Sequence, residues 1–417
     1  MSDSQPANES TQETLNDQIR QRYANLEAWK EDGIEPFGHR VDNVISATAA
    51  KSLYVEDSEE QEKVTIAGRL TNFRGMGKSI FADLRDSSDR IQIYAQKNVL
   101  GEETFAQFKR LDLGDILTIT GEVFKTRMGE ITIKVESFSL LSKALRPLPD
   151  KHSGLQDTEV RYRQRYLDLA SNAEAMDLFR KRSQIISEIR NYLQNKGFME
   201  VETPMLQSIP GGAAARPFIT HYNALNCQMY MRIAPELYLK RLLVGGFEKV
   251  FELNRNFRNE GLSRQHNPEF TMLELYQAYG NCEAMMELIE DLVCTVAEKV
   301  IGTLKIQHSE TKTIDLTRPW KRIPFRDLIS WHGGEDWYNV DHADRVERAK
   351  TLGLDVRDDW SDVEIDTEMY EKLIEPTLMN PTFVTRLPRE LVPLAKRCTD
   401  DPSLVDVYEL AINGQEI

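Results

Sequence analysis

The chain has 417 residues, of which 41% are hydrophobic and 29% charged, and its net charge is −15. This length exceeds what one ordinary core organises, so we expect two or three folding units. No run of about 18 apolar residues could span a bilayer, and the polar first 14 residues contain no apolar stretch typical of a secretion signal. We therefore expect a cytoplasmic protein that does not bind membranes.

The four cysteines form no Cys-x-x-Cys pair and have no nearby histidine at ligand spacing. This pattern argues against a zinc site and against a disulfide framework, and buried or idle thiols are the simpler interpretation. The seven histidines are scattered and form no metal-binding or hydrolytic motif.

The negative net charge argues at first against nucleic acid, because phosphate binding depends on lysine and arginine. The charge is unevenly distributed, however. Residues 335–417 carry 20 acidic and 9 basic residues, whereas residues 64–150 carry 11 acidic and 13 basic ones. The N-terminal part therefore remains suited to contact with RNA.

Residues 15–30 place apolar side chains at spacings of three and four, which predicts an amphipathic helix that Gly33 and Pro36 end. We assign this helix and a polar tail to an N-terminal segment, residues 1–62.

From residue 64 the apolar pattern changes to a period of two, which predicts short β-strands. The alternating stretches are residues 64–70, 79–84, 90–94, 116–123 and 130–135. An amphipathic stretch near residues 104–111 separates the third from the fourth and predicts a helix. Five strands with a helix in this place are the order of an OB-fold barrel, a recurrent oligonucleotide platform. We therefore predict an OB-fold domain over residues 63–145.

Residues 146–172 include Pro147, Pro149 and a polar run, and we interpret them as a linker. A long amphipathic helix follows over residues 173–196 and ends at Gly197. Strands and helices then mix, as in an α+β domain, which we assign to residues 173–417.

Within this second domain, the alternating residues 251–261 and 269–276 flank a polar turn and predict a long hairpin. Arg258 and Glu260 share one face of the first strand, and Glu274 and Tyr276 share a face of the second. An arginine beside carboxylates can hold an anionic phosphate and a cationic amine together. By itself, a salt-bridged sheet surface is the commoner explanation of such charges.

The order of the residues favours a specific site. Residues 257–274 read Phe-Arg-Asn-Glu, a loop, and then His-Asn-Pro-Glu-Phe-Thr-Met-Leu-Glu. This order resembles motif 2 of class II aminoacyl-tRNA synthetases, in the form of the bacterial-type lysyl enzymes of subclass IIb. Residues 197–204 resemble motif 1, the dimer-forming element, and residues 209–218 and 232–240 are similar to lysyl-type sequences. The resemblance covers nearly the whole chain, about residues 15–417.

The resemblance implies a lysine–tRNA ligase that activates L-lysine with ATP and Mg²⁺, transfers it to tRNA(Lys) in protein synthesis, and forms a homodimer through motif 1. The implied catalytic residue is Arg258, which would bridge the α-phosphate of ATP and the carboxylate of lysine. A planar, permanently charged guanidinium suits that role.

The remaining site residues are likewise implied by the family. ATP would contact Arg258, Glu260, His266 and Phe270, with Phe270 stacked on adenine. Lysine would contact Gly212, Glu236, Arg258, Glu274 and Tyr276. Magnesium would bind Glu409 and Glu416, which are hard oxygen ligands. Outside the resemblance, Phe270 would be an ordinary core residue, Gly212 part of a turn, and both metal-binding glutamates surface residues.

In the predicted barrel, Phe81, Gln92 and Glu130 match positions that stack on and hydrogen-bond the central uridine of the anticodon in related enzymes. Aromatic stacking and edge hydrogen bonds are how single-stranded bases are read. Phe81 could equally be an inward-facing barrel residue.

The sequence also departs from the family pattern. The closing motif 3, Gly-Leu-Gly-x-Gly-x-Asp-Arg, and the preceding Gly-Phe-Ser-Glu are absent from these 417 residues, so we expect an incomplete, C-terminally truncated catalytic domain. We accordingly expect ATP–pyrophosphate exchange at least about a hundredfold below that of a chain extended through motif 3. Residues 386–396 also differ from relatives.

Two other functions remain open at this point. One is a lysine ligase that modifies a protein, although such relatives lack the barrel predicted here. The other is an inactive RNA-binding or dimerising synthetase fragment, which would bind tRNA without supporting ATP–pyrophosphate exchange.

Overall fold

The computed structural model describes residues 6–56, 58, 60–149, 155–261, 263 and 266–417. Residues 150–154 of the predicted linker lie outside this range. The chain divides into two units, Met1–Met176 and Asp177–Ile417, each with its own internal packing.

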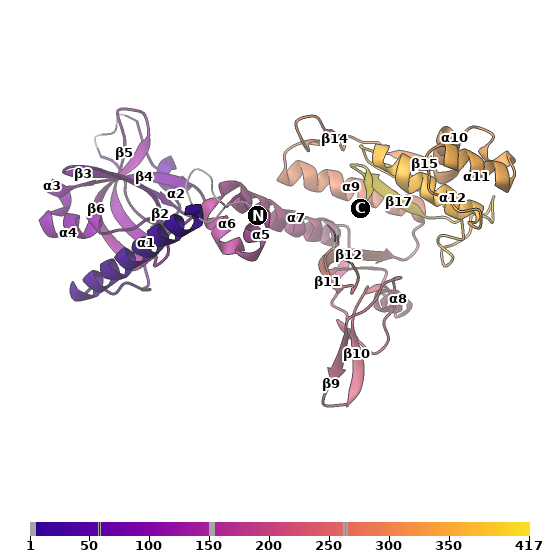
Figure 1. The fold of residues 1–417 in the computed structure, drawn as a ribbon, viewed down its shortest axis with the longest axis horizontal. Helices are drawn as coiled ribbons and strands as arrows, with labels where there is room; N and C mark the ends of the chain where they lie inside the picture. The colour runs from indigo at the N-terminus through magenta and orange to yellow at the C-terminus, as the bar shows by residue number, and fades with distance from the viewer. Residues whose placement is uncertain (1–5, 57, 59, 150–154, 262, 264–265) are drawn as a thin grey trace. The chain divides into compact units, whose positions relative to one another are not determined.

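Alternating apolar residues build a closed barrel in the first unit (Figure 1). The strands are β1 (Val44–Ile45), β2 (Lys63–Met76), β3 (Ser79–Arg85), β4 (Arg90–Gln96), β5 (Ile116–Lys125) and β6 (Ile131–Ser142). They follow the order β1-β2-β3-β4-β6-β5, and β2 also pairs with β5 to close the barrel. The five strands predicted from the period of two are confirmed as β2 to β6, each somewhat longer than its alternating stretch.

The period of two also divides each strand between the core and an outer face. Along β3, Ile80 and Ala82 are 1% exposed and belong to the barrel core, whereas Phe81 lies between them and outside that core. The inward alternative for Phe81 does not apply, because its ring is on the outer face.

The first unit also contains helices. They are α1 (Pro6–Glu31), α2 (Ala47–Ser52), α3 (Lys97–Leu100), α4 (Glu102–Lys109), α5 (Thr158–Arg163) and α6 (Arg165–Ser171). The predicted helix between the third and fourth strands is confirmed as α4. Trp29 of α1 is 1% exposed and packs edge-on against Phe138, while the buried Arg22 donates to the backbone oxygens of Leu113 and Ala144. These contacts fix α1 against the barrel. The predicted linker contains the short helices α5 and α6.

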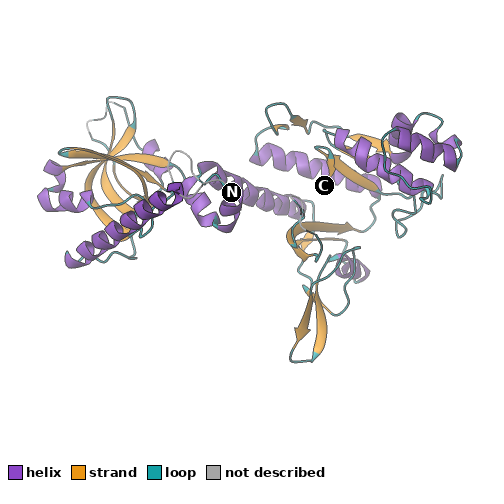
Figure 2. Ribbon diagram, in the orientation of Figure 1, coloured by secondary structure: helices purple, strands orange, loops and turns teal. Residues whose placement is uncertain are grey.

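The second unit mixes helices with several small sheets (Figure 2). Its helices are α7 (Ala173–Asn195, which begins in the first unit), α8 (Glu236–Val244), α9 (Cys282–Val300), α10 (Phe325–Gly333), α11 (His342–Thr351) and α12 (Asp362–Met369), with the short helical turns η1 (Trp337–Asn339), η2 (Tyr370–Ile374) and η3 (Glu375–Thr377). Its strands are β7 (Met199–Glu200), β8 (Leu206–Gln207), β9 (Ile219–Tyr222), β10 (Cys227–Met231), β11 (Lys249–Phe257), β12 (Glu269–Gln277), β13 (Lys305–Gln307), β14 (Thr313–Asp315), β15 (Lys321–Pro324), β16 (Thr382–Thr385), β17 (Tyr408–Ile412) and β18 (Gln415–Glu416).

Two sheets of this unit carry the residues of interest. The predicted hairpin is confirmed as β11 and β12, which pair antiparallel while β7 adds a parallel edge. A separate sheet has the order β15-β16-β17-β18. The predicted long helix is confirmed as α7, and Gly197 follows it with a φ of 82°, a conformation that suits glycine.

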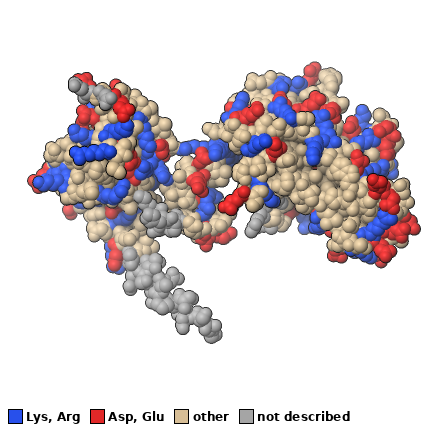
Figure 3. Space-filling view, turned by 90° about the horizontal axis from the view of Figure 1, so that it is seen from above, with Lys and Arg blue, Asp and Glu red and all other residues tan. Residues whose placement is uncertain are grey.

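Surface charge follows the distribution in the sequence. Figure 3 shows basic and acidic side chains interspersed, with acidic groups gathered at the end that carries α10 to α12. Within the described ranges, no helix is both long and apolar enough to cross a membrane.

Candidate functional sites

An aromatic pair stands on the outer face of the barrel. The rings of Phe81 on β3 and Tyr94 on β4 stack with centroids 4.4 Å apart and an interplanar angle of 26°. The Tyr94 hydroxyl accepts a hydrogen bond from Gln96 at 3.0 Å, which fixes the ring. One face of Phe81 is thus covered by Tyr94, and its other face can stack on a planar ligand.

The other two predicted barrel residues are hydrogen-bonded to each other beside this pair. Gln92 Nε2 donates to Glu130 Oε2 at 3.1 Å, and Thr132 Oγ1 donates to Gln92 Oε1 at 3.0 Å. Arg90 donates to Glu130 Oε1 at 2.7 Å and to Asp83 Oδ2 at 3.2 Å. The structure therefore brings Gln92 and Glu130 together and adds Arg90 and Asp83, which the sequence reasoning missed.

In the second unit, the hairpin register places carboxylates opposite each other. Glu252 on β11 pairs with Glu274 on β12. Burial, and then the negative charges of Glu236 and Glu252, raise the pKa of Glu274 to about 7, although the Tyr276 hydroxyl donates to Glu274 Oε2 at 3.0 Å. Burial and the charge of Glu274 also raise the pKa of Tyr276. This corner of the hairpin favours a bound cation.

Gly212 lies against Glu236 at the start of α8. A Cβ on Gly212 would lie 3.0 Å from the Cβ of Glu236 and 3.3 Å from that of Ala234, and its φ is 89°. Only glycine combines this backbone conformation with such a close approach. Glu236 also accepts an ion pair from Lys240, one turn further along α8. The structure thus brings Gly212, Glu236 and Glu274 into one group.

Arg258 directly follows β11. Its guanidinium lies 5.2 Å from the ring centroid of Phe270, and its Nε is buried with no hydrogen-bond partner in the described part of the chain. An unpaired, always-charged donor of this kind can bind an anion. Glu260 lies further along and accepts from the backbone nitrogen of Arg216 at 3.2 Å. His266 is exposed and bonds to Ser263 Oγ at 2.8 Å.

A buried ion pair supports the hairpin from within. Arg232 is 0% exposed, pairs with Glu252 and donates to the backbone oxygen of Arg255 at 2.9 Å. Glu252 also accepts from the Thr203 hydroxyl at 2.6 Å. The sequence reasoning assigned no role to Arg232 or Glu252, because periodicity along one strand does not show which residues pair across a fold.

The two predicted metal ligands lie in the other sheet. Glu409 on β17 is half-buried, and burial followed by the charges of Glu416 and Glu375 raises its pKa to about 7. Burial and Glu375 also raise the pKa of Glu416. Across the described residues, no group of three or more His, Cys, Asp or Glu side chains is arranged to hold a metal ion by itself. The donor set nevertheless suits Mg²⁺, because carboxylate oxygens with raised pKa values gain from a divalent cation whose other ligands a substrate supplies.

The predicted residues of the second unit thus form two groups. Gly212, Glu236, Glu274 and Tyr276 gather at the hairpin, with Arg258 and Phe270 further along the same strands. Glu409 and Glu416 belong to the sheet of β17 and β18, and no hydrogen bond or ion pair between described residues joins them to the hairpin.

Two family descriptions match this chain. "tRNA synthetases class II (D, K and N)" matches residues 157–417, and "OB-fold nucleic acid binding domain" matches residues 64–141. The chain therefore belongs to the class II tRNA synthetases of the D, K and N group, and its N-terminal barrel is an OB-fold.

Individual relatives are more specific than the family as a whole. The chain is 53% identical over 411 residues to the lysine–tRNA ligase of Pelotomaculum thermopropionicum, an alignment that covers 97% of this chain and 80% of the relative. It is 51% identical over 407 residues to that of Carboxydothermus hydrogenoformans, covering 97% and 82%. It is 49% identical over 416 residues to that of Bacillus subtilis, covering 98% and 83%. The predicted α+β architecture, an OB-fold followed by a class II synthetase domain, is confirmed.

Proposed function

We propose that the chain is a lysine–tRNA ligase that activates L-lysine with ATP and transfers it to tRNA(Lys) in the cytoplasm. The high identity to curated lysine–tRNA ligases over nearly the whole chain favours this function over a protein-modifying ligase and over an inactive fragment. The identity to these relatives is also the observation that carries lysine as the amino acid. The hairpin corner, where Glu236 lies close enough to raise the pKa of Glu274, suits the ammonium group of an amino acid.

The chemistry follows from the groups at the hairpin. A carboxylate oxygen of lysine attacks the α-phosphorus of ATP, and the bond to the leaving pyrophosphate breaks. The Arg258 guanidinium, with its unpaired Nε, holds both anionic partners and stabilises the charge that builds on the phosphorus oxygens. The ring of Phe270, beside Arg258, stacks on adenine, and Glu260 and His266 contact ATP from the hairpin loop.

Lysine is held by opposite charge and by shape. Glu236 and Glu274 receive the α-ammonium group, Tyr276 contacts the side chain, and Gly212 lets the backbone approach the amino acid. Glu409 and Glu416 would hold Mg²⁺, which neutralises the phosphates of ATP when bound. In the second half-reaction a ribose hydroxyl at the end of the tRNA attacks the lysyl carbonyl carbon, and AMP leaves. No covalent enzyme intermediate is needed.

The barrel face supplies the RNA contacts. Phe81 stacks on the central anticodon base, and Gln92 and Glu130 hydrogen-bond its edge. Residues 197–204, where Met199 is 50% exposed, form the homodimer contact that motif 1 implies.

Binding of the reaction intermediate tests the proposal without requiring turnover. Lysyl-, aspartyl- and asparaginyl-sulfamoyladenosine are stable mimics of the three adenylates that the D, K and N group would form. We expect calorimetry to give the tightest binding for the lysyl compound by at least about a hundredfold, because an unpaired buried ammonium or carboxylate is strongly disfavoured. Equal or tighter binding of another compound, or no binding of any, contradicts the proposal.

A further inference from the structure

The two glutamates assigned to Mg²⁺ share one face of their sheet. Glu416 pairs with Ala411, two residues after Glu409, and side chains in this relation lie on the same face. Glu409 pairs with Val384 of β16, which belongs to the same buried cluster as Tyr370 of η2. The face that carries the two glutamates is therefore the face against which η2 packs.

The turn between β17 and β18 is fixed to the chain that follows η2. Asn413 and Gly414 have φ angles of 60° and 75°, as in a two-residue hairpin turn. Their backbone nitrogens donate to the backbone oxygens of Met379 and Leu378, each at 3.0 Å. A Cβ on Gly414 would lie 2.8 Å from the backbone oxygen of Pro376, so the two segments are in close contact.

A side chain makes the next contact along β18. Glu375, the first residue of η3, accepts a hydrogen bond from the backbone nitrogen of Glu416 at its Oε1, at 2.5 Å. The backbone nitrogen of Ile417 donates to Leu410 of β17, so in an antiparallel pair the nitrogen of Glu416 points away from β17. A bond to a carboxylate is charge-assisted and stronger than one to a neutral acceptor. Glu375 thus fixes the backbone at a proposed metal ligand.

The buried hydroxyl of Tyr370 supports the convergence of these carboxylates. Tyr370 is 6% exposed, and its hydroxyl has no hydrogen-bond partner within the described ranges. Burial and then the charges of Glu409, Glu375 and Glu416 raise the pKa of this hydroxyl. Three negative groups therefore lie around one buried polar atom, and a bound cation would relieve their mutual repulsion.

The contact of Glu375 suits a residue that holds a metal ligand rather than one that binds the metal. Its Oε1 is used by the backbone of Glu416, and the described residues contain no group of three His, Cys, Asp or Glu side chains that could hold a metal ion. Hydrogen-bond partners behind a metal ligand set its orientation. Loss of such a partner typically lowers metal affinity by about 10- to 100-fold.

We propose that Glu375 is a positioning residue for the Mg²⁺ site. Its carboxylate fixes the backbone of β18 at Glu416, so that the Glu416 side chain is held on the sheet face beside Glu409. The hydrogen bond carries this role, and the negative charge of Glu375 does not. The proposal rests on the proposed function, because it requires that Glu409 and Glu416 bind Mg²⁺.

Two substitutions separate the hydrogen bond from the charge. Glu375→Gln removes the charge and keeps an acceptor oxygen at the same reach. Glu375→Asp keeps the charge but withdraws the oxygen by about 1.5 Å, the length of one carbon–carbon bond. Glu371→Gln is the matched control, because Glu371 is exposed and its charge also acts on Glu409, but it forms no hydrogen bond or ion pair with any described residue.

The first measurement is a titration of the full chain with Mg²⁺ alone at pH 8, followed by thermal melts. The rise of Tm above that of the same variant without Mg²⁺ gives an apparent Kd. We expect Glu375→Asp to raise this Kd by about 10- to 100-fold. Glu375→Gln and Glu371→Gln should each change it by less than about fivefold, since each removes only one nearby charge.

The second measurement needs no metal. Hydrogen–deuterium exchange, read by mass spectrometry with fragmentation to single residues, follows the backbone amide of Glu416. This amide should exchange faster in Glu375→Asp and at the unaltered rate in Glu375→Gln, because only the first variant loses the hydrogen bond. Far-UV circular dichroism confirms that each variant is folded. If Glu375→Asp does not fold, Glu375→Gln still tests the proposal, which requires its Mg²⁺ affinity to be retained.

The outcomes separate this inference from the proposed metal site. An equal loss of Mg²⁺ affinity in Glu375→Gln and Glu375→Asp would mean that Glu375 acts by its charge or as a ligand, and an unchanged affinity in Glu375→Asp would mean that it positions nothing. Either result overturns the inference and leaves the metal site in place. If the unaltered chain and Glu409→Gln respond equally to Mg²⁺, the proposed metal site is wrong and the inference falls with it.

Discussion

The barrel face and the synthetase hairpin differ in how their carboxylates are paired with positive charge. On the barrel, Arg90 lies between Asp83 and Glu130, so that two carboxylates share one guanidinium. At the hairpin, Glu274 forms no ion pair with any described residue. Burial and the charges of Glu236 and Glu252 outweigh the nearby charge of Arg232 and raise its pKa to about 7. Glu409 in the second sheet shows the same imbalance.

This difference matches the ligands proposed for each place. A base is neutral and is read by fixed donors and acceptors, so a partly neutralised, hydrogen-bonded network suits it. Lysine and Mg²⁺ are cations, and uncompensated carboxylates bind them because the ligand relieves the repulsion. The central claim is therefore that the second unit holds excess negative charge for its cationic substrates.

The largest expected effect comes from breaking the buried ion pair under the hairpin. Arg232→Met leaves the buried Glu252 without its partner and should lower the free energy of unfolding by about 3–5 kcal/mol. Urea denaturation of the full chain, followed by far-UV circular dichroism, measures it. Arg255→Met, which removes a half-exposed arginine from β11, the strand of Glu252, should change it by about 1 kcal/mol or less. Equal effects of the two variants would show that the pair is not structural.

Removing one carboxylate of the lysine site should weaken the binding of lysine but hardly that of ATP. Glu236→Gln should weaken lysine binding by about 1.5–3 kcal/mol, or roughly ten- to a hundredfold, because a charge-assisted bond is lost. The affinity for ATP should change far less. Calorimetry with each ligand gives both values, and the exposed Glu248→Gln is the control. A parallel loss for lysine and ATP contradicts the assignment of Glu236.

On the barrel face, we expect a substitution to lower the affinity for RNA and no other affinity. Phe81→Ala removes a stacking surface and should weaken binding of an RNA stem-loop that carries the anticodon UUU by about 1–3 kcal/mol, while lysine affinity is unchanged. Phe37→Ala, an exposed phenylalanine in the same unit, should bind the RNA normally. If Phe81→Ala unfolds the barrel or alters lysine binding, Phe81 is a packing residue after all.

The smallest expected effect is on the pH dependence of the stability of the fold. The pKa of Glu409 is about 7 in the native protein and 4.5 ordinarily, so the native state retains a proton that the unfolded chain loses between these values. Its contribution to stability therefore falls as pH rises from about 4.5 to 7. Thermal melts should show a fall in Tm from pH 6 to pH 8 that Glu409→Gln reduces.

Added Mg²⁺ tests, in the same thermal melts, whether Glu409 binds a metal ion. At pH 8, added Mg²⁺ should raise the Tm of the unaltered chain and have less effect on Glu409→Gln, because binding to the native state alone stabilises it. If both proteins respond equally, Glu409 is not a ligand.

Local patterns in the sequence were enough to predict much of this molecule. The period of two predicted the barrel strands, since one face of a strand such as β2 is buried and the other is not. Alternation and turn residues also predicted the hairpin, although β11 is mostly buried and β12 is half-buried along most of its length. The motif order placed Arg258, Glu236 and Glu274, and the structure brings the two glutamates together.

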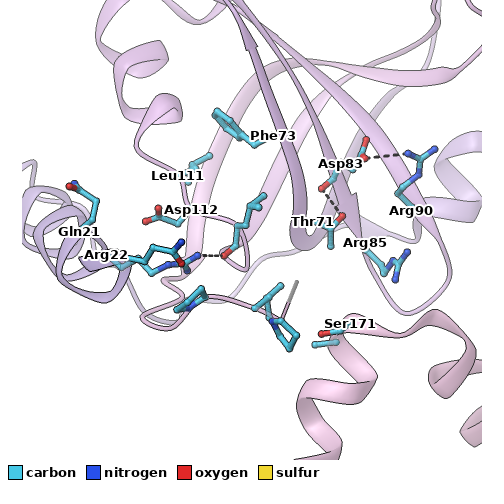
Figure 4. Close-up of a pocket in the computed structure, with 16 residues that line it drawn as sticks. Gln21, Arg22, Thr71, Phe73, Asp83, Arg85, Arg90, Leu111, Asp112 and Ser171 are labelled. Carbon is cyan, nitrogen blue, oxygen red and sulfur yellow. Dashed lines mark hydrogen bonds and ion pairs between the residues drawn. The ribbon is translucent and has the colours of Figure 1, made fainter. Parts of the chain in front are cut away.

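Contacts between distant segments could not be predicted in this way. Arg90 joins Asp83 to Glu130 across three strands, and Arg232 reaches Glu252 from a different sheet. Both depend on register and packing, which a single sequence does not specify. The first unit likewise contains a cavity lined by residues of α1, the barrel and α6, which are far apart in the chain (Figure 4).

The pH dependence of lysine binding tests the central claim most directly. If Glu274 must be ionised to hold the ammonium group, a pKa of about 7 predicts that the Kd for lysine falls roughly thirtyfold from pH 5.5 to pH 8 and levels off above pH 7. Calorimetry in buffers of constant ionic strength measures it, and Glu274→Gln should bind weakly with little dependence on pH. A Kd that is independent of pH in the unaltered chain, or a dependence that persists in Glu274→Gln, would contradict the account.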